Sequence, residues 1–201
     1  MRVDARSAPG VEHAALVQIV QKIHGRLNGG RPMHPIVNIA DLEPISRSAM
    51  SAKGGVSQPP ERFGGSMAQI GRKIGARHLG YNLTAVPPGK CAFPFHSHRV
   101  NEEMFFILEG EGEIRIGDAR HAIRAGDVIA CPPGGPESAH QIINTSNADL
   151  RYLAVSSEMP NEVCEYPDSN KFAVWAESGG DAKGFRFVGR AERSLDYWDG
   201  E

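Results

Sequence analysis

Residues 89–103 read Gly-Lys-Cys-Ala-Phe-Pro-Phe-His-Ser-His-Arg-Val-Asn-Glu-Glu, and they bring His96, His98 and Glu103 close together in the chain. Side chains alternate between the two faces of a β-strand, so the imidazoles of His96 and His98 project from the same face. Glu103 follows a short turn and opens an apolar run, 104–108, in which an inward carboxylate is costly unless it is paired or coordinated. The pattern predicts that these three side chains share a cation.

A third histidine, His140, opens a later apolar strand. Three neutral imidazoles and one carboxylate make a mixed nitrogen and oxygen set, which suits one divalent transition metal: Fe, Mn, Ni, Zn, Co or Cu. Calcium and magnesium prefer sites made of oxygen alone. The ligand types do not choose among the transition metals. Four protein ligands on an octahedral ion leave two positions for water or substrate, so the predicted site is chemically open.

The sequence beyond Gly80 consists of short apolar runs separated by turn residues, a pattern typical of an all-β sandwich or barrel. We predict strands near residues 80–87, 93–98, 103–108, 112–116, 120–124, 127–131, 139–144 and 150–157. Phe105 and Ile107 share the parity of Glu103, so we expect them to face the barrel interior and to line the substrate pocket as an apolar wall. Asn144 is interpreted as structural.

Segments on both sides flank this region. Apolar residues at helical spacing between Leu16 and Leu27 predict an amphipathic helix in an N-terminal extension, 1–32. We expect a lead-in strand and a long Gly-, Pro- and Ser-rich loop within 33–79, with the loop at 48–65. The barrel then takes residues 80–160, and residues 161–201 form a C-terminal arm that packs on it.

The composition of the chain limits the kinds of binding partner that we expect. The 201 residues carry 22 Lys plus Arg and 24 Asp plus Glu, for a formal net charge of -2 without a block of like charge, so neither nucleic acid nor a membrane is expected as a partner. The three cysteines include no CxxC pair, which argues against a disulfide framework and a thiolate zinc site. No apolar stretch is long enough for a signal sequence or a membrane span, and we expect a cytoplasmic protein.

Two motifs resemble those of the cupin superfamily. The first runs from Gly89 through His96, His98 and Glu103 to Gly110, and the second runs from Gly126 through Gly134 and His140 to Asn144. The resemblance implies a double-stranded β-helix, a jelly-roll-type barrel, with the three histidines and Glu103 as metal ligands. Five residues separate Gly134 from His140 where the family usually has two, so His140 reaches the site only if the structure absorbs a longer loop.

The resemblance also bears on function. Residues 164–170 and 196–201 are similar to segments of small bacterial single-domain cupins described as sugar-phosphate isomerases, and cupins commonly form homodimers. The favoured hypothesis is a metal-dependent enzyme of isomerase or dioxygenase type that acts on a small oxygenated molecule, with the metal as Lewis acid. The alternative is a non-catalytic cupin that senses a small ligand or a sugar. No catalytic residue is identified. Tyr81, His121 and Tyr166 are candidate acid–base groups, but the sequence does not place them relative to the metal ligands.

Overall fold

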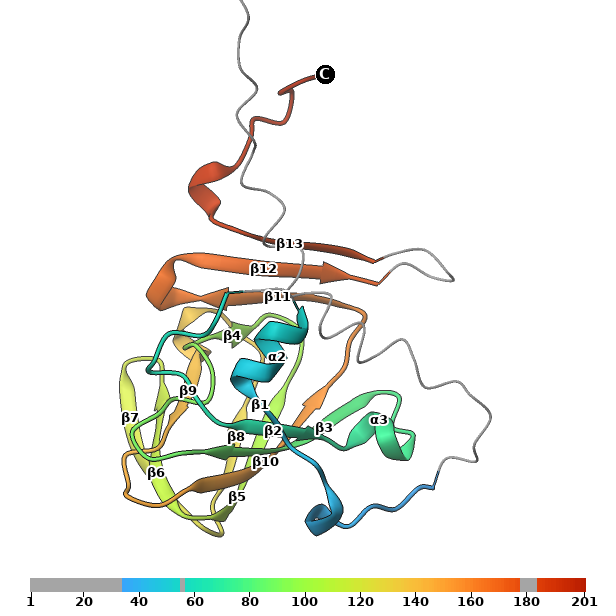
Figure 1. Ribbon diagram of the computed structural model, residues 1–201. Coiled ribbons are helices and arrows are strands. Elements are labelled where there is room, and N and C mark those ends of the chain that lie inside the picture. The colour runs from blue at the N-terminus through green and yellow to red at the C-terminus, as the bar shows by residue number, and fades with distance from the viewer. Residues whose placement is uncertain (1–33, 55–56, 178–183) are drawn as a thin grey trace, which may run out of the picture.

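The computed structural model describes residues 34–54, 57–177 and 184–201, and it consists mainly of antiparallel strands. Figure 1 shows a barrel with a further sheet lying across one end of it, from which the C-terminal segment extends away. The all-β barrel predicted from the sequence is confirmed. The predicted N-terminal helix falls within 1–32, outside the described residues.

The largest sheet has six strands, and it forms one wall of the barrel. Its order is β1 (Ile45–Ser46), β2 (Ser66–Gln69), β3 (Leu79–Val86), β10 (Leu150–Ser157), β5 (Glu103–Glu109) and β8 (Val128–Cys131). The opposite wall has the order β7 (Ala119–Arg124), β6 (Glu111–Ile116) and β9 (His140–Ile143). Inward side chains of both walls form the main hydrophobic core, which includes Ile107, Ile114 and Tyr152.

The outer face of the six-stranded sheet is covered as well. Leu42 of the lead-in segment packs with Ala68, Ile70 and Leu83 in a second apolar cluster, which Leu108 also contacts. Leu108 therefore points away from the barrel interior while Ile107 points into it, as the alternation along β5 predicts. Burial on both faces fixes the register of β5, because a slip of one residue would turn every side chain to the wrong face.

The third sheet is built almost wholly from the C-terminal part of the chain. Its order is β13 (Phe185–Gly189), β12 (Lys171–Ala176), β11 (Asn161–Tyr166) and β4 (Ser97–His98). The strand β4 belongs to the histidine motif, so the C-terminal segment pairs directly with the predicted site: Cys164 lies opposite His98 and Glu165 opposite Ser97.

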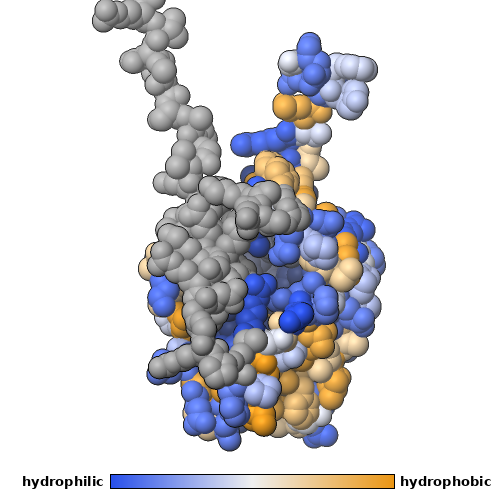
Figure 2. Space-filling model, turned by 90° about the vertical axis from the view of Figure 1, so that its right-hand side faces the viewer, coloured by the Kyte–Doolittle hydropathy of each residue, from blue (hydrophilic) through white to orange (hydrophobic). Residues whose placement is uncertain are grey.

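Short helical segments complete the structure: η1 (Ile39–Asp41), α2 (Arg47–Gly54), α3 (Gly71–Ile74), η2 (Pro136–Ser138), η3 (Pro167–Ser169) and η4 (Ala191–Arg193). No helix among the described residues is long and apolar enough to cross a membrane. On the face drawn in Figure 2, polar and apolar residues intermingle, and the C-terminal segment projects from the body.

Two predictions about local structure are wrong. The loop expected from Ser48 to Gly65 begins as helix α2, because the Ser46 hydroxyl caps the helix by accepting a 3.2 Å hydrogen bond from the Ala49 N–H. The strand expected at 93–98 is reduced to β4, Ser97–His98. Pro94 has no N–H with which to join a strand ladder, so regular pairing starts only after it.

Candidate metal centre

His96 and His140 are held together through their backbones. The His96 N–H donates to the His140 carbonyl at 3.2 Å, and the His140 N–H donates back to the His96 carbonyl at 2.7 Å. This antiparallel bridge joins the two cupin-like motifs, and it places the two imidazole ring centroids 4.7 Å apart. His140 is therefore close to the histidine pair despite the long segment that precedes it.

The η2 turn absorbs the extra residues before His140. The Ser138 N–H donates to the Gly135 carbonyl and the Ala139 N–H to the Pro136 carbonyl, at 3.1 and 3.2 Å. The Glu137 side chain closes the same turn by accepting the Gly135 N–H at 2.8 Å. The insertion thus forms a compact turn, and the chain returns to the barrel in the register that points His140 inward.

Three imidazole nitrogens converge on one oxygen of Glu103. The Nε2 atoms of His140, His98 and His96 lie 2.8, 3.4 and 3.8 Å from Glu103 Oε2. Glu103 is fixed on both sides by the six-stranded sheet, in which it pairs with Cys131 and with Ser156. The four residues singled out in the sequence therefore come together at one point. The grouping of His96, Glu103 and His140 is compact enough to hold a metal ion, with donor atoms within 4.8 Å of one another.

The pKa values of His96, His98 and Glu103 are all shifted, each for a different reason. Burial lowers the pKa of His96 to about 4, so that ring is neutral at ordinary pH. Burial alone would also lower the pKa of His98, but the Glu103 and Glu162 carboxylates outweigh it and raise the pKa to about 9. Burial would raise the pKa of Glu103, yet contacts with His140 and His98 hold it well below its usual range. The site therefore pairs the negative charge of Glu103 with a proton on His98, and a cation can replace that proton.

The site is only partly open to solvent. About a sixth of the side chains of His96, His98 and Glu103 is exposed, whereas only 4% of the His140 side chain is. The Phe105 ring, 5.5 Å from that of His140 between centroids, is an apolar neighbour of the site. Ile107 is fully buried in the main core, two residues farther along β5. A role of these two residues in lining a substrate pocket stays a prediction.

Glu162 is a buried carboxylate that the sequence reasoning missed. Its side chain is fully buried, and it accepts hydrogen bonds from four backbone N–H groups, of Arg99, Val100, Asn101 and Val163, at 2.7 to 3.0 Å. Its Oε2 also lies 3.4 Å from His98 Nδ1, a distance typical of an ion pair, although the geometry is not that of a hydrogen bond. Glu162 thus ties β11 to the loop that follows the histidine pair and places a negative charge behind His98.

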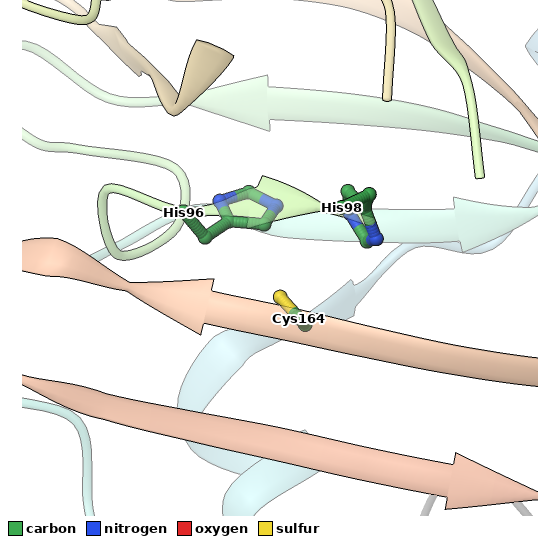
Figure 3. A group of neighbouring side chains, drawn as sticks. All are labelled: His96, His98 and Cys164. Carbon is green, nitrogen blue, oxygen red and sulfur yellow. The ribbon is translucent and has the colours of Figure 1, made fainter. Parts of the chain in front are cut away.

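Cys164 and Tyr166 share the inward face of β11 with Glu162. The Cys164 sulfur points toward the strand that carries the histidines (Figure 3). This sulfur and one donor nitrogen each of His96 and His98 all lie within 4.8 Å of one another. The Tyr166 ring stacks on the His96 ring, with centroids 6.1 Å apart and an interplanar angle of 21°. Burial raises the pKa of the Tyr166 phenol well above its usual value, so the phenol keeps its proton.

The other acid–base groups lie elsewhere. His121 is exposed on β7, and Tyr81 packs against the apolar cluster outside the six-stranded sheet. Asn144 is fully buried, and its side chain donates to the Val86 and Ala148 carbonyls while its oxygen accepts from Ser146. These contacts agree with the structural interpretation of Asn144.

Comparison with protein families matches residues 82–156 to the cupin domain. Over 71 residues the chain is 36% identical to an uncharacterised protein of Methanocaldococcus jannaschii, and over 70 residues it is 39% identical to the oxalate-binding protein of Thermotoga maritima. Each match covers 35% of this chain and 54% of the relative, so the chain spans about half the length of the curated relatives it matches.

The fold has known counterparts among solved structures. A cupin-superfamily protein of Silicibacter pomeroyi, described as a sugar phosphate isomerase, is similar with a TM-score of 0.62 at 23% sequence identity. The similarity covers 82% of this chain and 98% of that one. At this identity the likeness shows the fold alone.

Proposed function

We propose that the cupin domain of this chain binds one divalent transition metal through His96, His98, Glu103 and His140, and that it uses the cation as a Lewis acid on a small oxygenated molecule. The observation that carries the proposal is the convergence of three imidazole Nε2 atoms on Glu103 Oε2, at 2.8 to 3.8 Å. A carboxylate so placed among three imidazoles is the donor set that divalent transition metals prefer.

The surroundings of the ligands support this assignment. A metal-bound imidazole usually directs its other ring nitrogen to a carboxylate or a carbonyl. His98 Nδ1 faces Glu162 at 3.4 Å, and His96 Nδ1 lies 2.8 Å from the Pro94 carbonyl. Both rings therefore keep Nε2 turned toward Glu103, the orientation that a shared cation requires.

A bound cation would polarise carbonyl or carboxylate oxygens of a ligand and leave the chain's residues to orient it and to handle protons. Tyr166, stacked on His96 and protonated at ordinary pH, is a nearby group able to donate a hydrogen bond. Phe105 supplies an apolar side against His140. This combination suits an isomerase or dioxygenase type of reaction, with the metal identity open among Fe, Mn, Ni, Zn, Co and Cu.

The test begins with metal binding. We expect elemental analysis of untagged protein to find one transition-metal ion per chain, and calorimetric titration of stripped protein with Mn²⁺ to show one site. Loaded protein is then incubated in air with sugar phosphates, keto acids and catechols. Binding without turnover of any of these compounds would contradict the enzymatic part of the proposal, and failure to bind any metal would contradict all of it.

A second candidate function is non-catalytic capture of a small dicarboxylate. It is favoured by the relative from Thermotoga maritima, which is named an oxalate-binding protein. Titration of the metal-loaded protein with oxalate distinguishes the two. Saturable binding of unchanged oxalate, together with no turnover in the substrate screen, would favour this candidate, while turnover that His98→Ala abolishes would exclude it.

A further inference from the structure

We infer that Cys164 completes a second donor set with His96 and His98, and that this set takes a thiophilic divalent cation such as Co²⁺ or Zn²⁺ through the Cys164 sulfur. The inference rests on the proposed function, because the two donor sets share both histidines. It differs in the ligand that completes the site, which comes from the C-terminal sheet instead of the cupin barrel.

The geometry for this set comes from strand pairing. Cys164 on β11 lies directly opposite His98 on β4, so the two side chains project from the same face of the C-terminal sheet. Donor atoms of His96, His98 and Cys164 all lie within 4.8 Å of one another. In Figure 3 the sulfur is directed at the strand between the two imidazoles. Donors on a tetrahedral zinc ion lie about 3.3–3.6 Å apart, so modest side-chain rotations would close the set around an ion.

The two donor sets differ in chemical hardness. The proposed metal centre of His96, His98, Glu103 and His140 offers three nitrogens and an oxygen, whereas His96, His98 and Cys164 offer two nitrogens and a sulfur. Thiolate ligands favour softer ions, and carboxylates favour harder ones such as Mn²⁺. The identity of the metal would therefore determine whether the cation sits toward Glu103 or toward Cys164.

Binding to sulfur exchanges a proton for a metal ion. As the sulfur–metal bond forms, the S–H bond of Cys164 breaks and its proton leaves to water, with no change of oxidation state. Cys164 is only 2% exposed and forms no disulfide. A buried thiol of this kind reacts poorly with outside reagents, so a small cation that enters past the histidines is a suitable partner for it.

The test is the absorption spectrum of the full-length protein loaded with one equivalent of Co²⁺. We expect a thiolate-to-cobalt charge-transfer band in the near ultraviolet, lost in Cys164→Ser and retained in Cys91→Ser, the matched control at a partly exposed cysteine outside the site. We also expect the band to persist or to grow in Glu103→Gln, which weakens the competing set. Cadmium-113 NMR of the unmutated protein gives the same information without any variant, because sulfur ligation shifts the resonance strongly downfield.

The outcomes separate this inference from the proposed function. Tight Co²⁺ binding without the band, and a cadmium resonance typical of nitrogen and oxygen ligands, would overturn the sulfur set and leave the proposed metal centre standing. A band in a protein that does not bind Mn²⁺ would support the sulfur set and contradict the proposed set. If Co²⁺, Cd²⁺ and Mn²⁺ all failed to bind, both the sulfur set and the proposed metal centre would be overturned.

Discussion

Two sheets meet at the histidine pair, and they present different surroundings to it. The barrel contributes Glu103 and His140, and about a sixth of the Glu103 side chain reaches solvent. The C-terminal sheet contributes Glu162 and Cys164, and each of these residues exposes only 2% of its surface. The barrel side thus offers in Glu103 a donor that a ligand can approach, whereas the other side is a closed wall behind the imidazoles.

The difference lies in how each carboxylate is satisfied. Glu103 has imidazoles as its contacts, so its charge is available to a cation. Glu162 is already saturated by four backbone N–H groups, and a fully hydrogen-bonded carboxylate has little capacity left for an ion. Two glutamates beside the same histidine are therefore suited to different tasks: Glu103 to binding and Glu162 to holding His98 in place.

The sharpest test of this division is Glu103→Gln, which keeps the side-chain volume and removes the charge. We expect Mn²⁺ binding to weaken by more than about 100-fold, because partners of metal ligands alone contribute about 10–100-fold and a direct ligand contributes more. Calorimetric titration measures the change. Glu109→Gln, at the exposed end of the same strand, is the control and should bind as the unmutated chain does. Equal affinity in both variants would remove Glu103 from the site.

Glu162→Gln tests the closed wall. We expect metal affinity to fall by about 10–100-fold, since His98 loses its orienting carboxylate. The protein should also lose about 1–3 kcal/mol of unfolding free energy, because a Gln amide cannot satisfy all four N–H groups. Titration and urea unfolding measure the two effects. Glu165→Gln, on the outward face of the same strand, should change neither by as much. Undiminished affinity would reduce Glu162 to a purely structural residue.

The pH profile of metal binding tests how the two carboxylates act on His98 together. With its pKa raised to about 9, His98 carries a proton at neutral pH that the metal must displace. Affinity should therefore rise by about tenfold per pH unit and level off near pH 9, because each bound ion releases one proton. His96, with a pKa of about 4, is already neutral and adds nothing to this slope. Titrations at several pH values that gave a flat profile would contradict the prediction.

The smallest effect on the site is expected from the far edge of the C-terminal sheet. The strand β13 ends that sheet, and Phe185 on it is 59% exposed, so we expect this edge to contribute to the predicted homodimer. Phe185→Asp should shift the mass measured by light scattering from dimer to monomer, while metal affinity changes by less than about twofold. A monomeric unmutated protein would contradict the dimer, and a large loss of affinity would mean that β13 supports the site directly.

Much of the barrel side could be predicted from the sequence because its signals are local. The alternation in residues 103–108 gives both the strand and its inward face, and the spacing of His96, His98 and Glu103 places them together. His140 was the harder case, since the chain before it is longer than in the usual motif, and the η2 turn that returns it to the barrel is visible only in the structure. In the lead-in region, the Ser and Gly content of residues 48–65 indicated a loop, although helix α2 occupies the start of this segment and Ser46 caps it.

The C-terminal side could not be predicted because it depends on pairing between distant segments. No pattern within residues 161–166 reveals that Cys164 lies opposite His98, more than sixty residues earlier. A weak signal existed: Glu162 has the same parity as the buried Cys164. A carboxylate at a buried position of a strand requires a partner, and that requirement would have marked Glu162 as a residue to explain.

The hydrogen bonds of Glu162 have a consequence for protein engineering. By accepting the N–H groups of Arg99, Val100 and Asn101, this side chain joins the C-terminal hairpin to the loop inside the first motif. The match to the cupin domain ends at residue 156, before Glu162, Cys164 and Tyr166. A chimera that transplants residues 82–156 alone would therefore carry the ligands without their supporting wall, and exchange of activity between relatives should succeed only when loop and hairpin are swapped as one unit.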